Sequence, residues 1–168
     1  MKSIYVPVTQ NNLNYIKHIH PTDVRISVKD DLGLRFLAIL KLLSSHYRQR
    51  HEKVNKEKYP VYLKLLVSPN QYNSVKNISQ RGFHALNNKI DIMMKRDAYA
   101  FVRNKRKENP KCKIVDAITE FCDIYGLTMS EKQLSTLDRY ERRLREQNGE
   151  LLYKQNRKTQ YGTSKTEH

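Results

Sequence analysis

Clustered lysines and arginines are the residues of this sequence whose type and spacing best suit a chemical task, the binding of phosphate. Their charged groups attract nucleic-acid phosphates, supply most of the affinity and make it dependent on salt. A cluster is better evidence than any of its members, because a single cation is often only solvated surface. We therefore expect the nucleic-acid-binding residues to be Arg103, Lys105, Arg106, Lys107, Lys111, Lys113, Arg139, Arg142, Arg143 and Arg145.

The composition indicates the same class of partner. Lys and Arg number 32 against 17 Asp and Glu, which gives a net charge of +15. This excess is larger than solubility requires, and a polyanionic partner is its simplest explanation. We expect that partner to be nucleic acid, DNA rather than RNA, and no small-molecule substrate is evident. The many Lys, Asn, Ile and Tyr residues, with no Trp, are typical of an AT-rich genome such as that of a phage or mobile element.

Apart from one histidine triplet, the sequence spacing of the residues that could catalyse a reaction or hold a metal does not match a known catalytic or metal-binding motif. The sequence has no Gly-rich phosphate loop, no GxSxG motif and no clustered carboxylates, so we expect neither an enzyme nor a cofactor. Cys112 and Cys122 form no CxxC pair, and His46 and His51 do not share a helical face, so no zinc site is expected. Free thiols suit the cytoplasm of a bacterial or phage-infected cell.

The triplet His18-Ile19-His20 resembles the His-hydrophobe-His signature of single-strand nucleases that nick replication origins. The resemblance implies that the two histidines hold a divalent metal and that a tyrosine attacks the phosphate. Tyr72 with Lys76 would then be the nucleophile motif. In that family strands carry the triplet, whereas here Pro21 follows it directly. A nickase is thus one alternative, and two surface histidines at a turn are the other.

The elements that must position the cations are predicted to be helices. The apolar residues of the central stretch recur every three or four positions, which predicts a long helix from about His84 that runs into the basic block. They are Phe83, Leu86, Ile90, Met93 or Met94, Ala98, Phe101 and Val102. After Pro110, a second helix is predicted over 114–125, ended by Gly126 and with Ile114, Val115, Ile118, Phe121 and Cys122 on one side.

A last helix is predicted to begin after Thr128 or Ser130, and its apolar stripe is Leu134, Leu137, Leu144 and Leu151. The stretch 114–145 looks like a helix-turn-helix, which implies that its second helix reads the major groove of DNA. The turn GLTMSE is long for that motif. An ordinary hairpin of two helices is the alternative.

The first half of the chain predicts short strands alternating with helices. We expect strands over 3–8, 24–28 and 61–68, with Pro7 confining the first to a sheet edge. Thr9 caps a helix to about residue 18 that turns Leu13, Ile16 and Ile19 inward. Asp30 or Asp31 caps a core helix over about 32–54, with Leu32, Phe36, Ile39, Leu40, Leu43 and Tyr47 inward.

Ser68 and Pro69 begin a helix that runs to about Ser79, with Gly82 as its C-cap. The stretch Val61 to Met94 thereby resembles the ribbon-helix-helix family. The resemblance implies a strand that pairs across a dimer and lays its outward side chains in the major groove. Those side chains would be Tyr62, Lys64 and Leu66.

Together these elements predict a mainly α (α+β) fold with five or six helices and a small two- or three-stranded sheet. We expect a core region over 1–109, a helical hairpin over 110–153 and a disordered basic tail over 154–168. The longest apolar run, near 32–43, contains Arg35 and Lys41, and we expect neither a membrane span nor a signal peptide.

Two functions fit these expectations. One is a cytoplasmic DNA-binding protein that serves a phage or mobile element as an accessory factor or in transcription regulation. The other is a phage structural or assembly protein that contacts packaged nucleic acid as a homo-oligomer. Tyrosines close to basic residues would also suit the stacking of unpaired bases, and they are Tyr99, Tyr140, Tyr153 and Tyr161.

Overall fold

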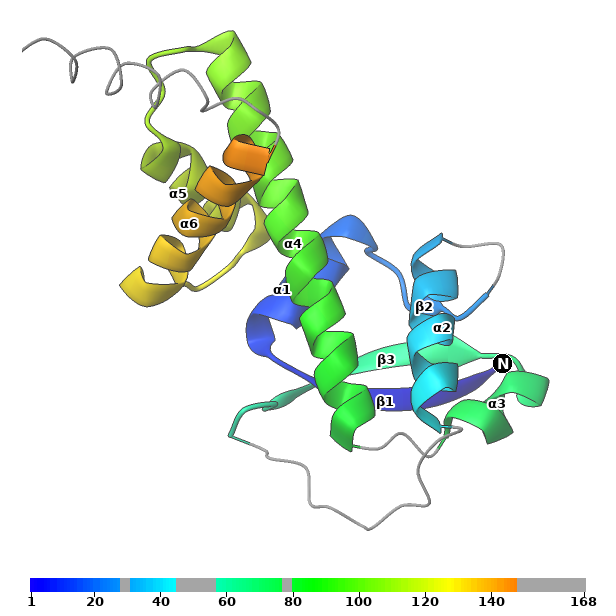
Figure 1. Cartoon of the computed structure of the whole chain (residues 1–168). Helices are drawn as coiled ribbons and strands as arrows, with labels where there is room; N and C mark the ends of the chain where they lie inside the picture. The colour runs from blue at the N-terminus through cyan, green and yellow to red at the C-terminus, as the bar shows by residue number, and fades with distance from the viewer. Residues whose placement is uncertain (28–30, 45–56, 77–79, 148–168) are drawn as a thin grey trace, which may run out of the picture. The chain divides into compact units, whose positions relative to one another are not determined.

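The computed structural model describes residues 1–27, 31–44, 57–76 and 80–147. Over these residues six helices and three short strands follow one another in the order β1, α1, β2, α2, β3, α3, α4, α5, α6 (Figure 1). The predicted α+β class, the number of helices and the small sheet are confirmed. The predictions for residues 45–54 and for the tail over 154–168 lie outside the described residues.

The sheet is mixed, with β3 (Val61–Val67) between β1 (Lys2–Val8) and β2 (Val24–Arg25). β1 runs antiparallel to β3 and β2 runs parallel to it. Pro7 lies in an edge strand as predicted, where its missing N–H costs no ladder bond. The strand expected over 24–28 is shorter, since β2 ends at Arg25, although the Ile26 N–H still donates to the Leu66 carbonyl at 2.8 Å.

The central place of β3 corrects the ribbon-helix-helix resemblance. β1 of the same chain pairs with β3 along its whole length, and β2 takes Leu65 and Leu66 on the other edge, so β3 is a central strand and not one that pairs across a dimer as in that family. The predicted inter-helix glycine is also wrong, because α3 (Pro69–Val75) ends early and Gly82 lies within α4 (Gln80–Glu108).

One face of the sheet is covered by helices. Alternate side chains of β1 and β3, among them Val6 and Leu65, are fully buried. α1 (Gln10–Ile19) contacts β3, and α2 (Asp31–Ser44) contacts β2. The apolar stripe of α2 supplies Leu32, Phe36 and Leu40 to this core as predicted, together with Leu37, while Ile39 is only half-buried.

Local chemistry sets where several helices begin and end. The hydroxyl of Thr9 accepts from the Asn12 N–H at 3.2 Å, and that of Ser68 accepts from the Gln71 N–H at 3.3 Å, so both predicted N-caps are confirmed. α5 (Ile114–Tyr125) ends at Gly126, whose φ of 61° favours glycine. The Leu127 N–H donates to the Cys122 carbonyl at 2.8 Å, the bond that marks a Schellman C-cap.

Two predicted inward side chains are exposed. Ile19 is 37% exposed because it is the last residue of α1. Val115 is 57% exposed because it lies at the margin of the buried arc that Ala117, Ile118 and Phe121 define on α5. On α4 the predicted stripe is buried at Leu86, Ile90, Met94, Ala98 and Val102, whereas Phe83, Met93 and Phe101 are half-buried.

The chain divides into two compact units. The first comprises residues 1–96 and 122–128, and the second comprises 97–121 and 129 onward. The second unit therefore holds the last part of α4, the first part of α5 and α6 (Glu131–Gln147). The expected regions over 1–109 and 110–153 stay a prediction. None of the helices in the described ranges is long and apolar enough to cross a membrane.

Candidate nucleic-acid interface

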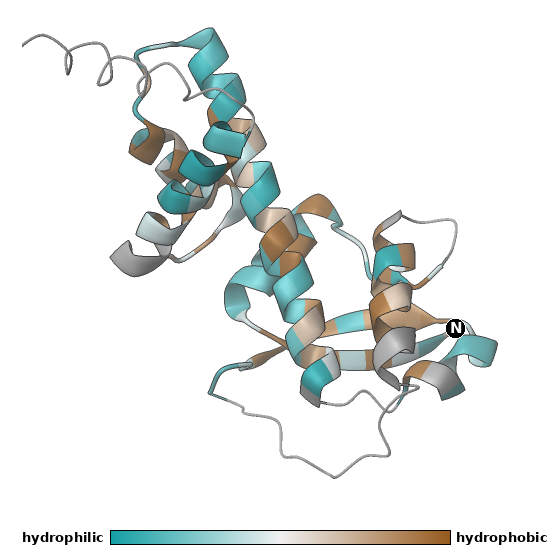
Figure 2. Cartoon of the chain, viewed as in Figure 1, coloured by the Kyte–Doolittle hydropathy of each residue, from teal (hydrophilic) through white to brown (hydrophobic). Residues whose placement is uncertain are grey.

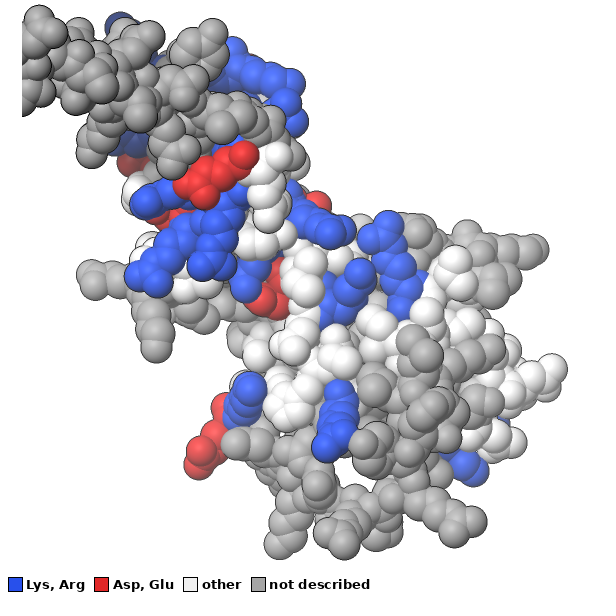
Figure 3. All heavy atoms as spheres, in the orientation of Figure 1, with Lys and Arg blue, Asp and Glu red and all other residues white. Residues whose placement is uncertain are grey.

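All ten cations that the sequence singles out belong to the second unit. Four come from the last two turns of α4, two from the link that follows it, and four from α6. Figure 3 shows lysine and arginine side chains grouped over this unit, with acidic side chains among them. Figure 2 shows that the end of α4 and most of α6 are hydrophilic along their length.

A small apolar core holds these helices in place. Val102 of α4, Phe121 of α5 and Leu137 of α6 are buried, and the rings of Phe101 and Phe121 lie 5.8 Å apart. Seven of the predicted cations are exposed around this core: Arg103, Lys107, Lys111, Lys113, Arg139, Arg142 and Arg143. The other three, Lys105, Arg106 and Arg145, are half-buried.

Lys105 joins two helices of the unit. Its Nζ lies 2.6 Å from Glu120 Oε1 on α5 and 5.6 Å from the centre of the Phe101 ring. The hydrogen bond to Glu120 raises the pKa of Lys105. The charge of Lys105 is therefore already partly balanced within the protein, and less of it is available to a ligand.

Arg145 is paired with a buried acid. Glu141 lies one turn earlier on α6 and is only 4% exposed, and the Arg145 Nε lies 2.8 Å from its Oε1 and 2.9 Å from its Oε2. Burial raises the pKa of Glu141, and the charges of Arg145 and Arg106 oppose that shift. Glu141 interrupts an apolar stripe at the spacing Leu134, Leu137, Glu141, Leu144, and that spacing could have signalled its burial from the sequence.

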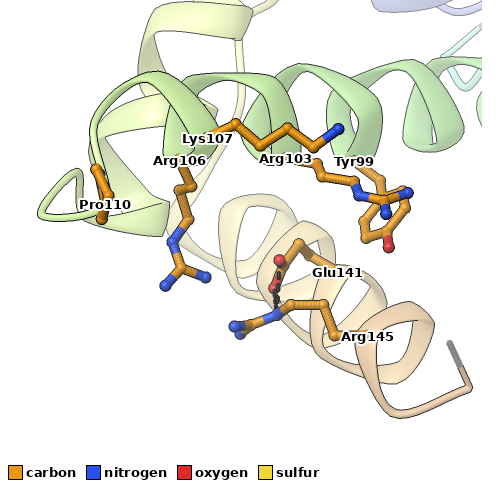
Figure 4. A pocket seen from close by; sticks show the side chains of 7 residues that line it. All are labelled: Tyr99, Arg103, Arg106, Lys107, Pro110, Glu141 and Arg145. Atoms are coloured by element: carbon orange, nitrogen blue, oxygen red, sulfur yellow. Dashed lines mark hydrogen bonds and ion pairs between the residues drawn. The ribbon is translucent and has the colours of Figure 1, made fainter. Parts of the chain in front are cut away.

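An open pocket of about 400 Å³ lies between α4 and α6 within this unit (Figure 4). The side chains of Arg106 and Arg145 extend into the same space from the two helices. The Nε of Arg106 is buried and has no hydrogen-bond acceptor in the part of the chain that the structure describes. The residues that line the pocket are Tyr99, Arg103, Arg106, Lys107, Pro110, Glu141 and Arg145.

The chemistry of this pocket suits an anion. Three guanidinium groups and one ammonium group surround a single carboxylate, so the lining carries a net positive charge. Guanidinium groups bind phosphate and carboxylate oxygens in charge-assisted pairs, and Arg106 and Arg145 extend theirs into this space. Tyr99 adds an aromatic ring at the same pocket.

The residues of the nickase alternative belong to the first unit. His18 is near the end of α1, with its ring 4.2 Å from that of Tyr125, and His20 is the C-cap. Tyr72 lies on α3 under the ammonium group of Lys2. Across the described residues, no group of three or more His, Cys, Asp or Glu side chains is placed to hold a metal ion.

The elements of the predicted helix-turn-helix are present in the expected order. α5, the turn at Gly126 and α6 follow one another as the helix-turn-helix resemblance requires, and the contact of α6 with DNA stays a prediction. Both cysteines are free thiols, with Cys112 half-buried and Cys122 buried. Tyr140 is half-buried on α6, and Tyr153 and Tyr161 lie outside the described residues.

Comparison with protein-family models, with curated proteins and with solved structures gives no significant match for this chain.

Proposed function

We propose that this protein binds nucleic acid, and DNA rather than RNA, through the lysines and arginines of its second unit. In this proposal it acts by contact and not by catalysis. The observation that carries the proposal is the gathering of ten cations from α4, α6 and the link after α4 in one compact unit. Within the cell we propose a cytoplasmic regulatory or accessory role for a phage or mobile element, which the composition supports.

The exposed members of the cluster are the proposed phosphate contacts. Arg139 and Arg143 lie one turn apart on α6, so they follow one face of that helix. Such contacts release counterions, and the logarithm of affinity then falls with the logarithm of salt concentration by about 0.9 for each phosphate contacted on duplex DNA. The half-buried Arg106 is proposed to hold one phosphate at the pocket.

The test is a titration of a labelled DNA duplex at several salt concentrations, read by fluorescence anisotropy. Replacing Arg139 and Arg143 by alanine should weaken binding on all sequences and lower the salt slope by about 2. The matched control replaces Lys17 and Lys76, which are exposed in the first unit, and removes the same total charge. If the two double variants lose affinity and slope equally, general charge and not this surface explains binding.

Cys112 provides a second readout at the link. It lies between Lys111 and Lys113 and is half-buried, whereas Cys122 is buried and burial raises the pKa of its thiol. Iodoacetamide should therefore modify Cys112 first, since the thiolate is the reactive form. Bound duplex should slow that modification. Unchanged labelling of Cys112 under saturating duplex would remove Lys111 and Lys113 from the interface.

A further inference from the structure

The face of the sheet opposite the helix-covered core carries two exposed tyrosines, although Pro7 on the same face is buried. Successive side chains of a strand point to opposite faces. Ile4 and Val6 of β1 and Leu63 and Leu65 of β3 are buried, while Tyr5 is 61% exposed and Tyr62 is 52% exposed. The two tyrosines therefore lie on the solvent side of the first unit.

The strand register brings these tyrosines together. Tyr5 is opposite Lys64, and Pro7 is opposite Tyr62, so the two rings belong to diagonal positions of one antiparallel pair. Such positions are about 7–8 Å apart, within reach of aromatic side chains. Leu66 of β3 is opposite Ser3 and pairs with the exposed Arg25 of β2. We call the group Tyr5, Tyr62, Lys64, Leu66 and Arg25 the sheet platform.

The sheet platform combines aromatic rings with positive charge. Lys64 Nζ lies 2.6 Å from Asp23 Oδ2, so its charge is already partly balanced, although the two side chains are 40% and 42% exposed. Arg25 presents a second cation on the neighbouring strand. An apolar protein partner would favour a platform without these cations, whereas a nucleic acid needs both a ring to stack on and a charge beside it.

We propose that the sheet platform binds unpaired bases of a single-stranded nucleic acid. Bases would stack on the rings of Tyr5 and Tyr62, and the exposed Arg25 would contact a phosphate that flanks them. Sheet faces with exposed aromatic residues bind single strands because every unpaired base has a flat face that can stack on a ring. Bases within a duplex are stacked on one another, so their faces are not available. Its residues belong to the first unit, whereas the cations of the proposed duplex interface belong to the second.

The test compares two double variants with the wild type by anisotropy on labelled single strands of twelve thymidines or twelve uridines. Tyr5→Leu with Tyr62→Leu keeps apolar side chains but removes the rings, and Tyr5→Phe with Tyr62→Phe keeps the rings. Loss of stacking on one aromatic ring weakens binding by about 5- to 150-fold. The leucine variant should lose at least about tenfold on single strands, and the phenylalanine variant should bind within about twofold of wild type.

A matched control removes an exposed apolar side chain away from the platform. Ile92 is 40% exposed on the part of α4 in the first unit, and Ile92→Ala should bind single strands as the wild type does. A single strand with 5-iodouracil should cross-link on irradiation to Tyr5 or Tyr62, as peptide mapping would show. The thymidine and uridine arms tell which nucleic acid the platform prefers.

The proposal is overturned if the leucine variant binds single strands like the wild type, or if the leucine and phenylalanine variants lose affinity equally. Cross-links confined to the second unit would also overturn it. Its failure is distinguishable from failure of the proposed function, which concerns duplex binding by Arg139 and Arg143. A platform that fails leaves the duplex titration intact, and a double arginine variant without effect on duplex leaves the tyrosine comparison intact.

Discussion

Glu141 is the acid around which the pocket of the second unit is arranged. It occupies a core position on α6, where an apolar side chain would be expected, and Arg145 accompanies it on the same helix. A buried charge is tolerated when it is paired and hydrogen-bonded, and removing its partner is costly. Glu141 thereby fixes Arg145 at the pocket and leaves the Nε of Arg106 as the buried donor that lacks an acceptor among the described residues.

The raised pKa of Glu141 predicts a specific dependence of stability on pH. In the folded state burial penalises the charged carboxylate and raises its pKa. At a pH between the unfolded and folded pKa values, the folded protein therefore holds a proton that the unfolded chain has released. As pH rises from the ordinary glutamate value of about 4.3, the wild type should lose stability relative to Glu141→Gln, which cannot ionise. The difference should grow by about 1.4 kcal/mol for each unit by which the pKa is raised.

Urea unfolding followed by circular dichroism, at several pH values between about 4 and 7, measures this difference. Glu146→Gln on the same helix is the matched control, because the Glu146 side chain is exposed to solvent in the folded protein. A difference that shrinks as pH rises would mean that the attraction of Arg145 and Arg106 outweighs burial, and it would contradict the assignment.

At the scale of elements, a buried amide network joins α4 to the start of α1. The Asn87 side-chain oxygen accepts from the Thr9 N–H at 3.1 Å and from the Asn12 side-chain amide at 2.9 Å. Its own amide nitrogen donates to the carbonyls of Pro7 and Phe83, at 3.0 and 2.8 Å. Asn12 and Asn87 are 4% and 5% exposed, so these bonds satisfy groups that water does not reach.

Replacing Asn87 by alanine should therefore destabilise the first unit strongly. The change leaves the Thr9 N–H, the Pro7 carbonyl and the Asn12 amide without this partner, and each unsatisfied buried group costs about 1–3 kcal/mol. We expect a loss of about 2–4 kcal/mol in the free energy of unfolding, measured by urea denaturation. Asn88→Ala is the matched control, because Asn88 is the exposed neighbour on the same helix. This variant should lose no more than about 0.5 kcal/mol in the free energy of unfolding. Similar losses for both variants would mean that the network contributes little.

The approach of α2 to β2 is a second constraint between elements. A Cβ added to Gly33 would lie 2.0 Å from the Arg25 carbonyl oxygen and 2.9 Å from the Ser27 nitrogen. No side chain fits at that distance, so the glycine allows the helix to lie directly against backbone. This contact holds the strand that carries Arg25 of the sheet platform.

In the whole molecule, each of the two units has one candidate surface, and the two surfaces differ in chemistry. The second unit has clustered cations and a pocket lined mainly by them, and the first has two exposed tyrosines on its sheet. Clustered cations suit the phosphates of a duplex, and exposed rings suit unpaired bases. The two proposals together would give a protein that binds a duplex through one unit and a single strand through the other.

The mass of the protein in solution, measured together with its duplex affinity, separates this role from that of an assembly protein. We expect light scattering to give a monomer or a small oligomer, and we expect duplex binding to persist at physiological salt and to fall steeply above it. An assembly of high order with no duplex affinity at that salt would favour the structural role.

Much of this fold follows from short stretches of sequence. Thr9, Ser68 with Pro69, and Gly126 end or begin helices through bonds to neighbours a few residues away, so their roles could be predicted. The stripe of α4 could be predicted for the same reason, because helical spacing is a local property. The start of α4 at Gln80 could not be predicted, because Gly82 suggests a helix end. The packing of the whole helix, which is not a local property, keeps Gly82 within α4.

The positive charge, the helices that carry it and the apolar alternation of each strand can be read from local stretches of sequence. The central place of β3, the burial of Glu141 beside Arg145 and the shared face of Tyr5 and Tyr62 depend on the fold. Strand register and helix packing join residues far apart in the chain. The partner of Tyr62 across the ladder is Pro7, fifty-five positions earlier, and no local pattern specifies that pairing.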